Sequence, residues 1–163
     1  DWRVSQADMN ADAPFSTFSS VDRSLTLLQG RLSLSFDGGR EVIRPARFTP
    51  FRFPGEAPVT GRVEDGPISD LNVMTRRGVV SAKVERLTGE LDLPAAPFAR
   101  VLFAHDPLQV HKPPSVNLDR YDALLLAPED PDVAVSADHG TVFLVLFEPA
   151  AASTWPLKVE RRF

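Results

Sequence analysis

The stretch Asp70-Leu71-Asn72-Val73-Met74-Thr75-Arg76-Arg77-Gly78 decides the fold of this chain. Apolar residues and a threonine fall on one parity, and an amide, a thioether and charges fall on the other, which is typical of a half-buried strand. Asn72 is unusual there, because asparagine is poorly suited to the middle of a strand. If its side chain faces a cavity, we expect it to hydrogen-bond a bound molecule.

Turn signals recur at short intervals on both sides of this strand. The 15 prolines among 163 residues are about twice the average share of roughly 5%. Asp37-Gly38-Gly39 predicts a hairpin, a parity change at Gln29-Gly30 predicts a bulge, and Asp65-Gly66-Pro67 and Ala137–Gly140 predict further turns. The apolar run Val142–Phe147 predicts a strand covered on both faces. Without a helical period of any length, the pattern predicts an all-β sandwich or barrel.

Composition excludes several classes of function. The chain has no cysteine, which rules out disulfides and thiolate metal sites. A net charge of −4 provides no basic field for nucleic acid or an anionic membrane, and no apolar run approaches the roughly 20 residues of a membrane helix. The chain opens without a signal peptide and starts abruptly in strand-like sequence, so we expect further residues ahead of Asp1.

The length predicts a single unit over residues 1–163, or two halves with a boundary near residues 91–99. The boundary is expected there because Leu91–Pro97 ends in two prolines separated by alanines.

Residues for metal or nucleophilic chemistry are sparse. His105, His111 and His139 lack metal-ligand spacing, so we expect surface or loop positions for all three and neither a metal nor another cofactor. No Gly-x-Ser-x-Gly motif occurs, and the acidic pairs lie in turn-like sequence. We therefore predict no catalytic residue.

Polar side chains on otherwise apolar strands remain as candidates for a binding pocket. Such a pocket is concave and apolar with a few convergent polar groups, and an arginine in it favours a carboxylate ligand. The alternative is that the arginines reach solvent and the asparagine caps a neighbouring backbone group. The predicted ligand-binding set, with two phenylalanines as walls, is Arg3, Ser5, Arg23, Phe51, Phe53, Asn72 and Met74.

Several motifs, taken together and in order, resemble the HutD/Ves family. They are Trp2–Ser5, Pro14–Ser16, Val21–Arg23, Phe53–Gly55, Asp70–Gly78 and Tyr121–Leu124. The resemblance implies a cupin-like double-stranded β-helix, which is a jelly-roll barrel, either alone or as a bicupin of two packed barrels. It also implies a cytoplasmic bacterial protein linked to histidine utilisation or, in the other branch, to stress and cold response.

The sequence departs from related patterns at two points. Family members usually carry a Trp-Lys-Asn-Gly-Gly-Gly type segment ahead of the Trp-Arg-Val-Ser strand, and it is not seen here. The His-x-His, Glu and His set of metal-binding cupins is also missing, as it is from the HutD/Ves family. Metal chemistry of cupins is therefore not carried over to this chain.

These observations favour a metal-free cupin-like protein that binds a small carboxylate. The resemblance implies urocanate or formylglutamate as the ligand and a role in modulating histidine utilisation. One alternative is an isomerase or hydrolase that uses a carboxylate or a water in the barrel. Another is a structural protein that forms a homodimer through a strand edge or an apolar face.

Overall fold

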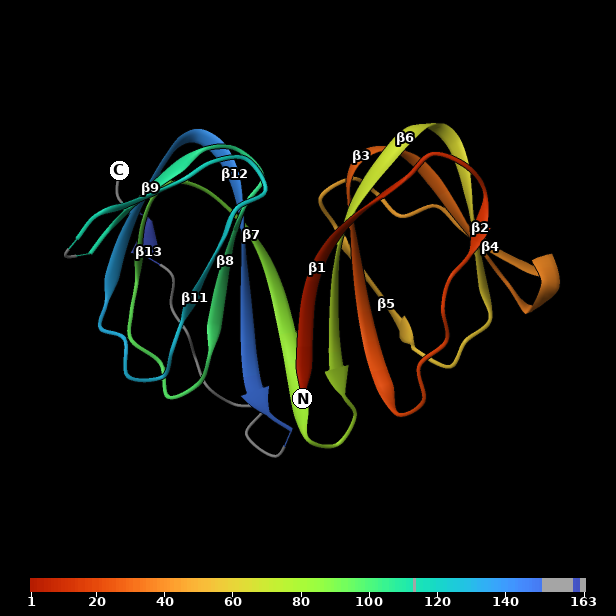
Figure 1. Ribbon diagram of the computed structural model, residues 1–163, viewed down its shortest axis with the longest axis horizontal. Coiled ribbons are helices and arrows are strands. Elements are labelled where there is room, and N and C mark those ends of the chain that lie inside the picture. Colours follow the sequence, from red (N-terminus) through yellow and green to blue (C-terminus); the bar gives the residue numbers. More distant parts are fainter. Residues whose placement is uncertain (113, 151–159, 162–163) are drawn as a thin grey trace. The chain divides into compact units, whose positions relative to one another are not determined.

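The computed structural model describes residues 1–112, 114–150 and 160–161, which form strands joined by turns (Figure 1). Within this part of the chain, the helical structure is one short 3-10 turn, η1 (Asp37–Gly39). The prediction of an all-β chain is thus confirmed. No helix among the described residues has the length and hydropathy that a membrane span requires.

The chain divides into two compact units, unit 1 at residues 1–80 and unit 2 at residues 81–163. This boundary lies before residues 91–99, which is the segment where the sequence predicted it. Leu91 and Leu93 are fully buried in the core of unit 2, and Ala96 and Phe98 belong to the same core. The prolines of this segment therefore mark a connection within unit 2.

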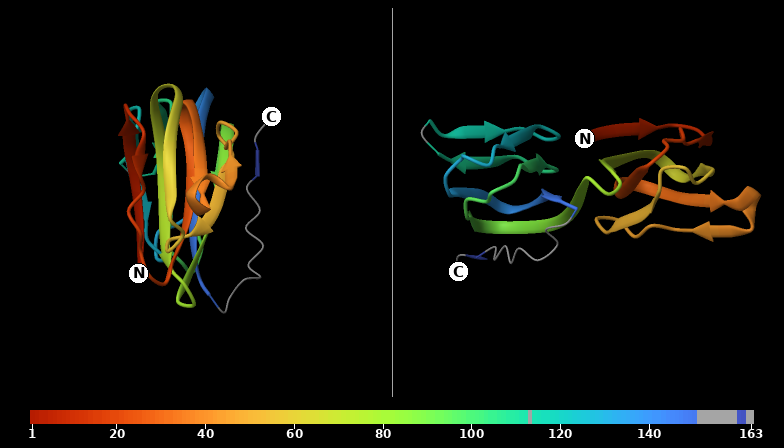
Figure 2. Two further views of the ribbon diagram at one scale, coloured as in Figure 1. Left: turned by 90° about the vertical axis from the view of Figure 1, so that its right-hand side faces the viewer. Right: turned by 90° about the horizontal axis from the view of Figure 1, so that it is seen from below.

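Unit 1 is a curled antiparallel sheet of six strands. Their order is β1-β6-β3-β4, with β2 beside β6 and β5 beside β3. Figure 2 shows the strands wrapping around the interior of the unit. The strands are β1 (Trp2–Met9), β2 (Ala13–Pro14), β3 (Val21–Phe36), β4 (Glu41–Ile43), β5 (Pro50–Pro54) and β6 (Val59–Arg76).

A bulge in β3 lets one long strand bend and still fill the core. Its register with β6 shifts between Leu27 and Leu32, and Gly30 has a φ of 76°. Leu27 before the shift and Leu32 after it have opposite parity, yet both pack in the same core cluster. The predicted bulge at Gln29-Gly30 is confirmed, and η1 forms the predicted hairpin between β3 and β4.

Two expected turns are wrong, because each lies inside a long strand. Asp65-Gly66-Pro67 lies within β6, and Ala137–Gly140 lies within β12 (Val133–Pro149). The second segment falls where β12 changes partner, from β9 before it to β8 after it. Residues typical of turns therefore mark points where a continuous strand bends between neighbours.

Unit 2 contains the remaining strands and the larger apolar core. Val142 to Phe147 are each at most 3% exposed, so this run is buried on both parities as predicted. The sheet has the order β10-β9-β12-β7-β13, with β8 joining β12 to β11. The strands other than β12 are β7 (Val80–Leu93), β8 (Arg100–Ala104), β9 (Leu108–His111), β10 (Val116–Leu118), β11 (Ala123–Leu126) and β13 (Glu160–Arg161).

Truncating a leucine in the unit 2 core tests this packing. Leu144 is fully buried, whereas Leu125 is 53% exposed on β11. Leu144→Ala should lower the free energy of unfolding by about 2–5 kcal/mol, because it removes buried methyl groups and leaves a cavity. Leu125→Ala, the matched control, should change it by less than about 1 kcal/mol. Urea unfolding of both variants is the measurement, and equal effects would contradict the described core.

Candidate functional site

The seven predicted site residues lie on one face of the unit 1 sheet, in two adjacent cross-strand rows. The first row crosses β1, β6, β3 and β5, and the second crosses the same strands two residues further along each strand. Opposed residues of an antiparallel pair point to the same face, so these side chains share one surface. The rows are Arg3–Met74–Arg23–Phe53 and Ser5–Asn72–Leu25–Phe51.

This face is turned toward the interior of unit 1. Leu25 and Phe53 belong to its apolar core, with Phe51 packed against them. Arg23 and Asn72 are only 4% and 5% exposed. The register between the strands thus brings the predicted residues to one face, and their role in binding stays a prediction.

Arg23 is a buried cation enclosed by aromatic rings and polar acceptors. Its guanidinium carbon lies 5.1 Å from the ring centres of Phe15 and Phe53 and 5.8 Å from that of Phe18. Nη1 donates to the carbonyl of Ser16 at 3.1 Å. Nε has no hydrogen-bond partner, and a buried donor left unpaired costs about 1–3 kcal/mol. Burial lowers the pKa of Arg23, and Asp70 opposes this change.

Asn72 connects Arg23 to a buried carboxyl group. Its Oδ1 accepts from Arg23 Nη2 at 3.1 Å, and its Nδ2 donates to Asp70 Oδ1. Burial raises the pKa of Asp70 to about 7, the charge of Arg23 opposes the rise, and Asp8 adds to it. The Asn72 side chain thus has its hydrogen-bond partners within the protein. The alternative interpretation of the sequence also expected internal partners, but on the backbone, whereas the observed partners are side chains.

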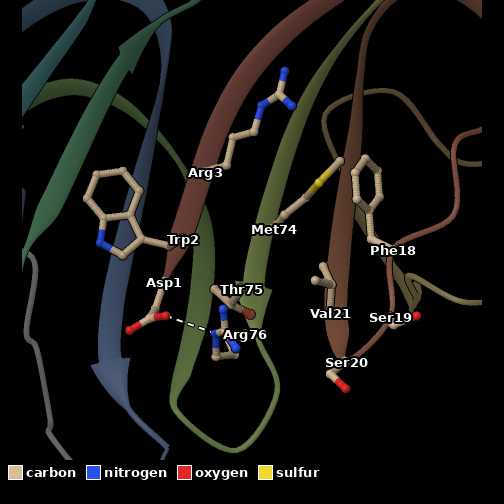
Figure 3. A pocket seen from close by; sticks show the side chains of 10 residues that line it. All are labelled: Asp1, Trp2, Arg3, Phe18, Ser19, Ser20, Val21, Met74, Thr75 and Arg76. Carbon is tan, nitrogen blue, oxygen red and sulfur yellow. Dashed lines mark hydrogen bonds and ion pairs between the residues drawn. The ribbon is translucent and has the colours of Figure 1, made fainter.

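A pocket of about 270 Å³ opens beside the first row, at the start of β1 and the end of β6. We call it the mouth pocket. Figure 3 shows Met74 extending toward the Phe18 ring, with Arg3 leaving the neighbouring strand beside it. Its lining residues are Asp1, Trp2, Arg3, Phe18, Ser19, Ser20, Val21, Met74, Thr75 and Arg76.

Two of the predicted residues, Arg3 and Met74, line the mouth pocket. Arg23 borders it from inside, because it lies opposite Met74 in register and contacts Phe18, which the pocket shares. Ser5, Asn72, Phe51 and Phe53 lie deeper along the two rows. The pocket's arginines also differ in their partners: Arg76 pairs with Asp1 at 2.9 Å, whereas the Arg3 side chain bonds no other described residue.

Two functional candidates, Asp70 and Phe18, were missing from the predicted set. Asp70 has the same parity as Asn72, so the alternation of the strand contained the signal. Phe18 precedes β3 in a segment without regular structure. No periodicity could have shown where its ring would lie.

The described histidines of unit 2 lie at a loop or on the surface, as expected. His105 lies in the bend after β8, where it is buried at 3% exposed, with its ring centre 5.9 Å from that of Tyr121. His111 is exposed on β9 as expected, and the side chain of His139 lies outside the described part. The described residues contain no cluster of three or more acidic or histidine side chains suited to a metal ion.

Unit 2 also holds a short polar chain on its surface. His111 Nε2 lies 2.6 Å from Ser136 Oγ, which donates to Glu90 Oε2 at 2.8 Å. In a catalytic triad the imidazole stands between the hydroxyl and the carboxylate. Here it stands at one end, so this chain does not have the arrangement of a triad.

Comparisons with known proteins decide the family. The HutD family model matches residues 1–144.

The chain belongs to the HutD family.

HutD from Pseudomonas fluorescens SBW25, a solved structure of a similar protein, is 26% identical, with a TM-score of 0.76. The match covers 91% of this chain and 79% of that one. Protein Ves from Cronobacter sakazakii is 39% identical over 85 residues, which are 52% of this chain and 47% of the relative. The chain thus spans about half the length of the curated relatives it matches.

The cupin-like fold is also confirmed. A cupin 2 conserved barrel domain protein from Leptotrichia buccalis aligns with a TM-score of 0.59, at 10% identity over 91% of this chain and 83% of that one. This likeness shows the fold alone. HutD family membership and the cupin-like barrel therefore agree with the resemblance inferred from the motifs.

The buried carboxyl group of Asp70 predicts a dependence of stability on pH. Its pKa rises from an ordinary 3.8 to about 7 on folding, so its stabilising contribution is complete below pH 4 and is lost as the pH rises through 7. The loss is at most about 4 kcal/mol, since one pKa unit corresponds to ~1.4 kcal/mol. Asp70→Asn should flatten the unfolding free energy between pH 4 and 8, whereas the exposed-residue control Asp37→Asn should keep the wild-type slope. An unchanged slope in Asp70→Asn would contradict the burial of this group.

Proposed function

We propose that unit 1 binds a small carboxylate at the mouth pocket, and that this binding modulates histidine utilisation in the cytoplasm. The observation that carries the proposal is the placement of Arg3, which lines an apolar pocket and whose side chain has no partner among the described residues. Guanidinium and carboxylate groups pair in a bidentate geometry. Phe18 and Met74 provide the surface on which the rest of the ligand rests.

Arg23 strengthens the positive potential behind this pocket. It lies one strand beyond Met74, in the same row as Arg3. Asp70, the buried acid nearest in its hydrogen-bond chain, has a pKa of about 7 and is therefore partly protonated at neutral pH. The charge of Arg23 is then incompletely neutralised, which favours an anion at the pocket.

The size of the pocket favours a small ligand. Its volume of about 270 Å³ lies just below the ~300–1,000 Å³ of pockets for larger organic ligands. Urocanate has a flat ring and one carboxylate, which match the Phe18 and Met74 surface and the Arg3 guanidinium. Formylglutamate has two carboxylates and a polar chain, so we place it second.

The family supports this choice of ligand class. HutD from P. fluorescens was solved under a formate condition, and formate is the simplest carboxylate. The resemblance to the HutD/Ves family implies a link with histidine utilisation, in which urocanate and formylglutamate are intermediates. We therefore propose a role in sensing or buffering such an intermediate.

Titration with urocanate and formylglutamate tests the proposal. At about 100 times the dissociation constant, a ligand should stabilise the protein by about 2.7 kcal/mol, which appears as a clear thermal shift. Arg3→Gln should weaken urocanate binding about 10- to 100-fold, since hydrogen bonds to charged groups contribute about 1.5–3 kcal/mol. Arg62→Gln, an exposed arginine of β6 away from the pocket, is the matched control.

Urocanate methyl ester provides a second control, because it keeps the ring and lacks the negative charge. We expect it to bind at least tenfold more weakly than urocanate. No heat signal and no thermal shift with either acid would refute the proposed function. Equal binding by Arg3→Gln and Arg62→Gln would place the ligand elsewhere.

Catalysis is a second candidate function, and Asp70 is the observation that favours it. A buried carboxyl group with a pKa near 7 is suited to accept or donate a proton. It is connected to Arg23 through Asn72, although it does not line the mouth pocket. If the protein is an enzyme, prolonged incubation should change the absorbance of urocanate, and Asp70→Asn should abolish that change while it retains binding.

A further inference from the structure

The motif Arg76-Arg77-Gly78 contributes a surface clamp that the proposed function does not use. Arg77 donates through Nη1 and Nη2 to the two carboxylate oxygens of Glu56, at 3.1 and 2.9 Å. Its Nε donates to Asp22 Oδ1 at 2.7 Å. Arg77 thus makes a bidentate ion pair with the turn after β5 and a further contact with the start of β3. The bond to Arg77 contributes most to lowering the pKa of Glu56 to about 2.

Arg77 and Glu56, which we call the clamp, also hold the backbone of one wall of the mouth pocket, the segment from Phe18 to Val21. The amide of Arg77 donates to the carbonyl of Ser20 at 2.9 Å, and its Nη2 donates to the carbonyl of Val21 at 2.9 Å. Glu56 Oε1 accepts from the amide of Ser20 at 2.6 Å. Ser20 and Val21 are pocket-lining residues, so the clamp binds the wall without lining the pocket.

The wall needs such support because its backbone is strained. Ser20 has a φ of 58°, in the left-handed region that residues with a Cβ rarely adopt. The turn at Gly55 approaches the wall closely, since a Cβ there would lie 2.7 Å from the carbonyl oxygen of Phe18. The amide of Phe18 donates to the carbonyl of Gly55 at 2.9 Å. The clamp therefore fixes the chain just after the position from which the Phe18 ring projects, and the Gly55 turn holds the backbone of Phe18 itself.

We infer that Arg77 and Glu56 are positioning residues for the mouth pocket, holding the segment from Phe18 to Val21 so that Phe18 presents its ring to the body of a ligand. This inference rests on the proposed function for the nature of the ligand. The inference predicts a selective effect on affinity. The two residues strengthen the binding of a carboxylate whose ring or chain rests on Phe18, and they do not change the binding of a bare carboxylate.

The test compares Arg77→Lys and Glu56→Gln with a matched control. Lysine keeps the charge of Arg77 but loses its bidentate geometry, and glutamine removes the charge of Glu56. Arg44→Lys is the control, because Arg44 forms an exposed ion pair with Glu64 at 2.8 Å in the same unit and away from the pocket. Each variant is examined by amide hydrogen exchange over residues 18–21, by thermal unfolding, and by titration with urocanate and with formate.

We expect both clamp variants to exchange the Ser20 amide at least fivefold faster and to bind urocanate five- to tenfold more weakly. Their formate affinity and unfolding temperature should match those of Arg44→Lys. Unchanged exchange in both clamp variants would overturn the inference. An equal loss of urocanate and formate binding would overturn it too, because that result indicates general damage to the site.

The two proposals fail in distinguishable ways. If the wild-type protein binds neither urocanate nor formylglutamate, the proposed function is refuted. The hold of Arg77 and Glu56 on the segment from Phe18 to Val21 is then decided by the exchange rate of the Ser20 amide alone. If the wild type binds, and the clamp variants match Arg44→Lys in urocanate affinity and in Ser20 amide exchange, the positioning role is refuted and the binding function stands.

Discussion

The buried guanidinium of Arg23 is the constraint on which the interior of unit 1 depends. A cation removed from water requires acceptors and polarisable neighbours, because burial of an unpaired charge is costly. Three aromatic rings, the Ser16 carbonyl and Asn72 meet this requirement, and Asn72 in turn engages Asp70. The polar residue in the middle of β6 is thus explained first by a neighbouring cation.

The same arrangement gives unit 1 an asymmetry of charge. Asn72 separates Arg23 from Asp70, so the two do not form a direct ion pair in the hydrogen-bond chain. Asp70 takes up a proton near neutral pH because it is buried. The Arg23 guanidinium, whose Nε has no hydrogen-bond partner, therefore lies next to Met74 and Phe18. It is close to the mouth pocket, where Arg3 is exposed. This combination makes the site suited to an anion of modest size.

Alternation along the strands predicted more of this site than of the strand connections. Alternation within one strand placed Asn72 and Met74 on the same face, whereas the position of Arg3 and Arg23 on that face depends on the register between strands. Alternation also located the bulge at Gly30, where the apolar residues change parity. The segments at Asp65–Pro67 and Ala137–Gly140 misled, because a bend in a long strand uses the same residue types as a turn between two strands.

Other features depend on tertiary structure that no local pattern contains. The Phe18 ring reaches Arg23 from an irregular segment, and Arg77 reaches Glu56 across 21 positions of sequence. Arg100 shows the same limit in unit 2, where a fully buried arginine donates to the carbonyl groups of Pro94 and Asp130. These contacts arise when distant turns meet. The sequence motifs contain some of the residues involved, such as Arg77, but they do not indicate which residues those side chains contact.

A crystal structure of the protein with urocanate tests the proposed carboxylate site most directly. We predict density in the mouth pocket, with the carboxylate within hydrogen-bond distance of the Arg3 guanidinium and the ring against Phe18 and Met74. Urocanate bound with its carboxylate away from Arg3 and Arg23, or a mouth pocket without ligand at saturating urocanate, would contradict this assignment.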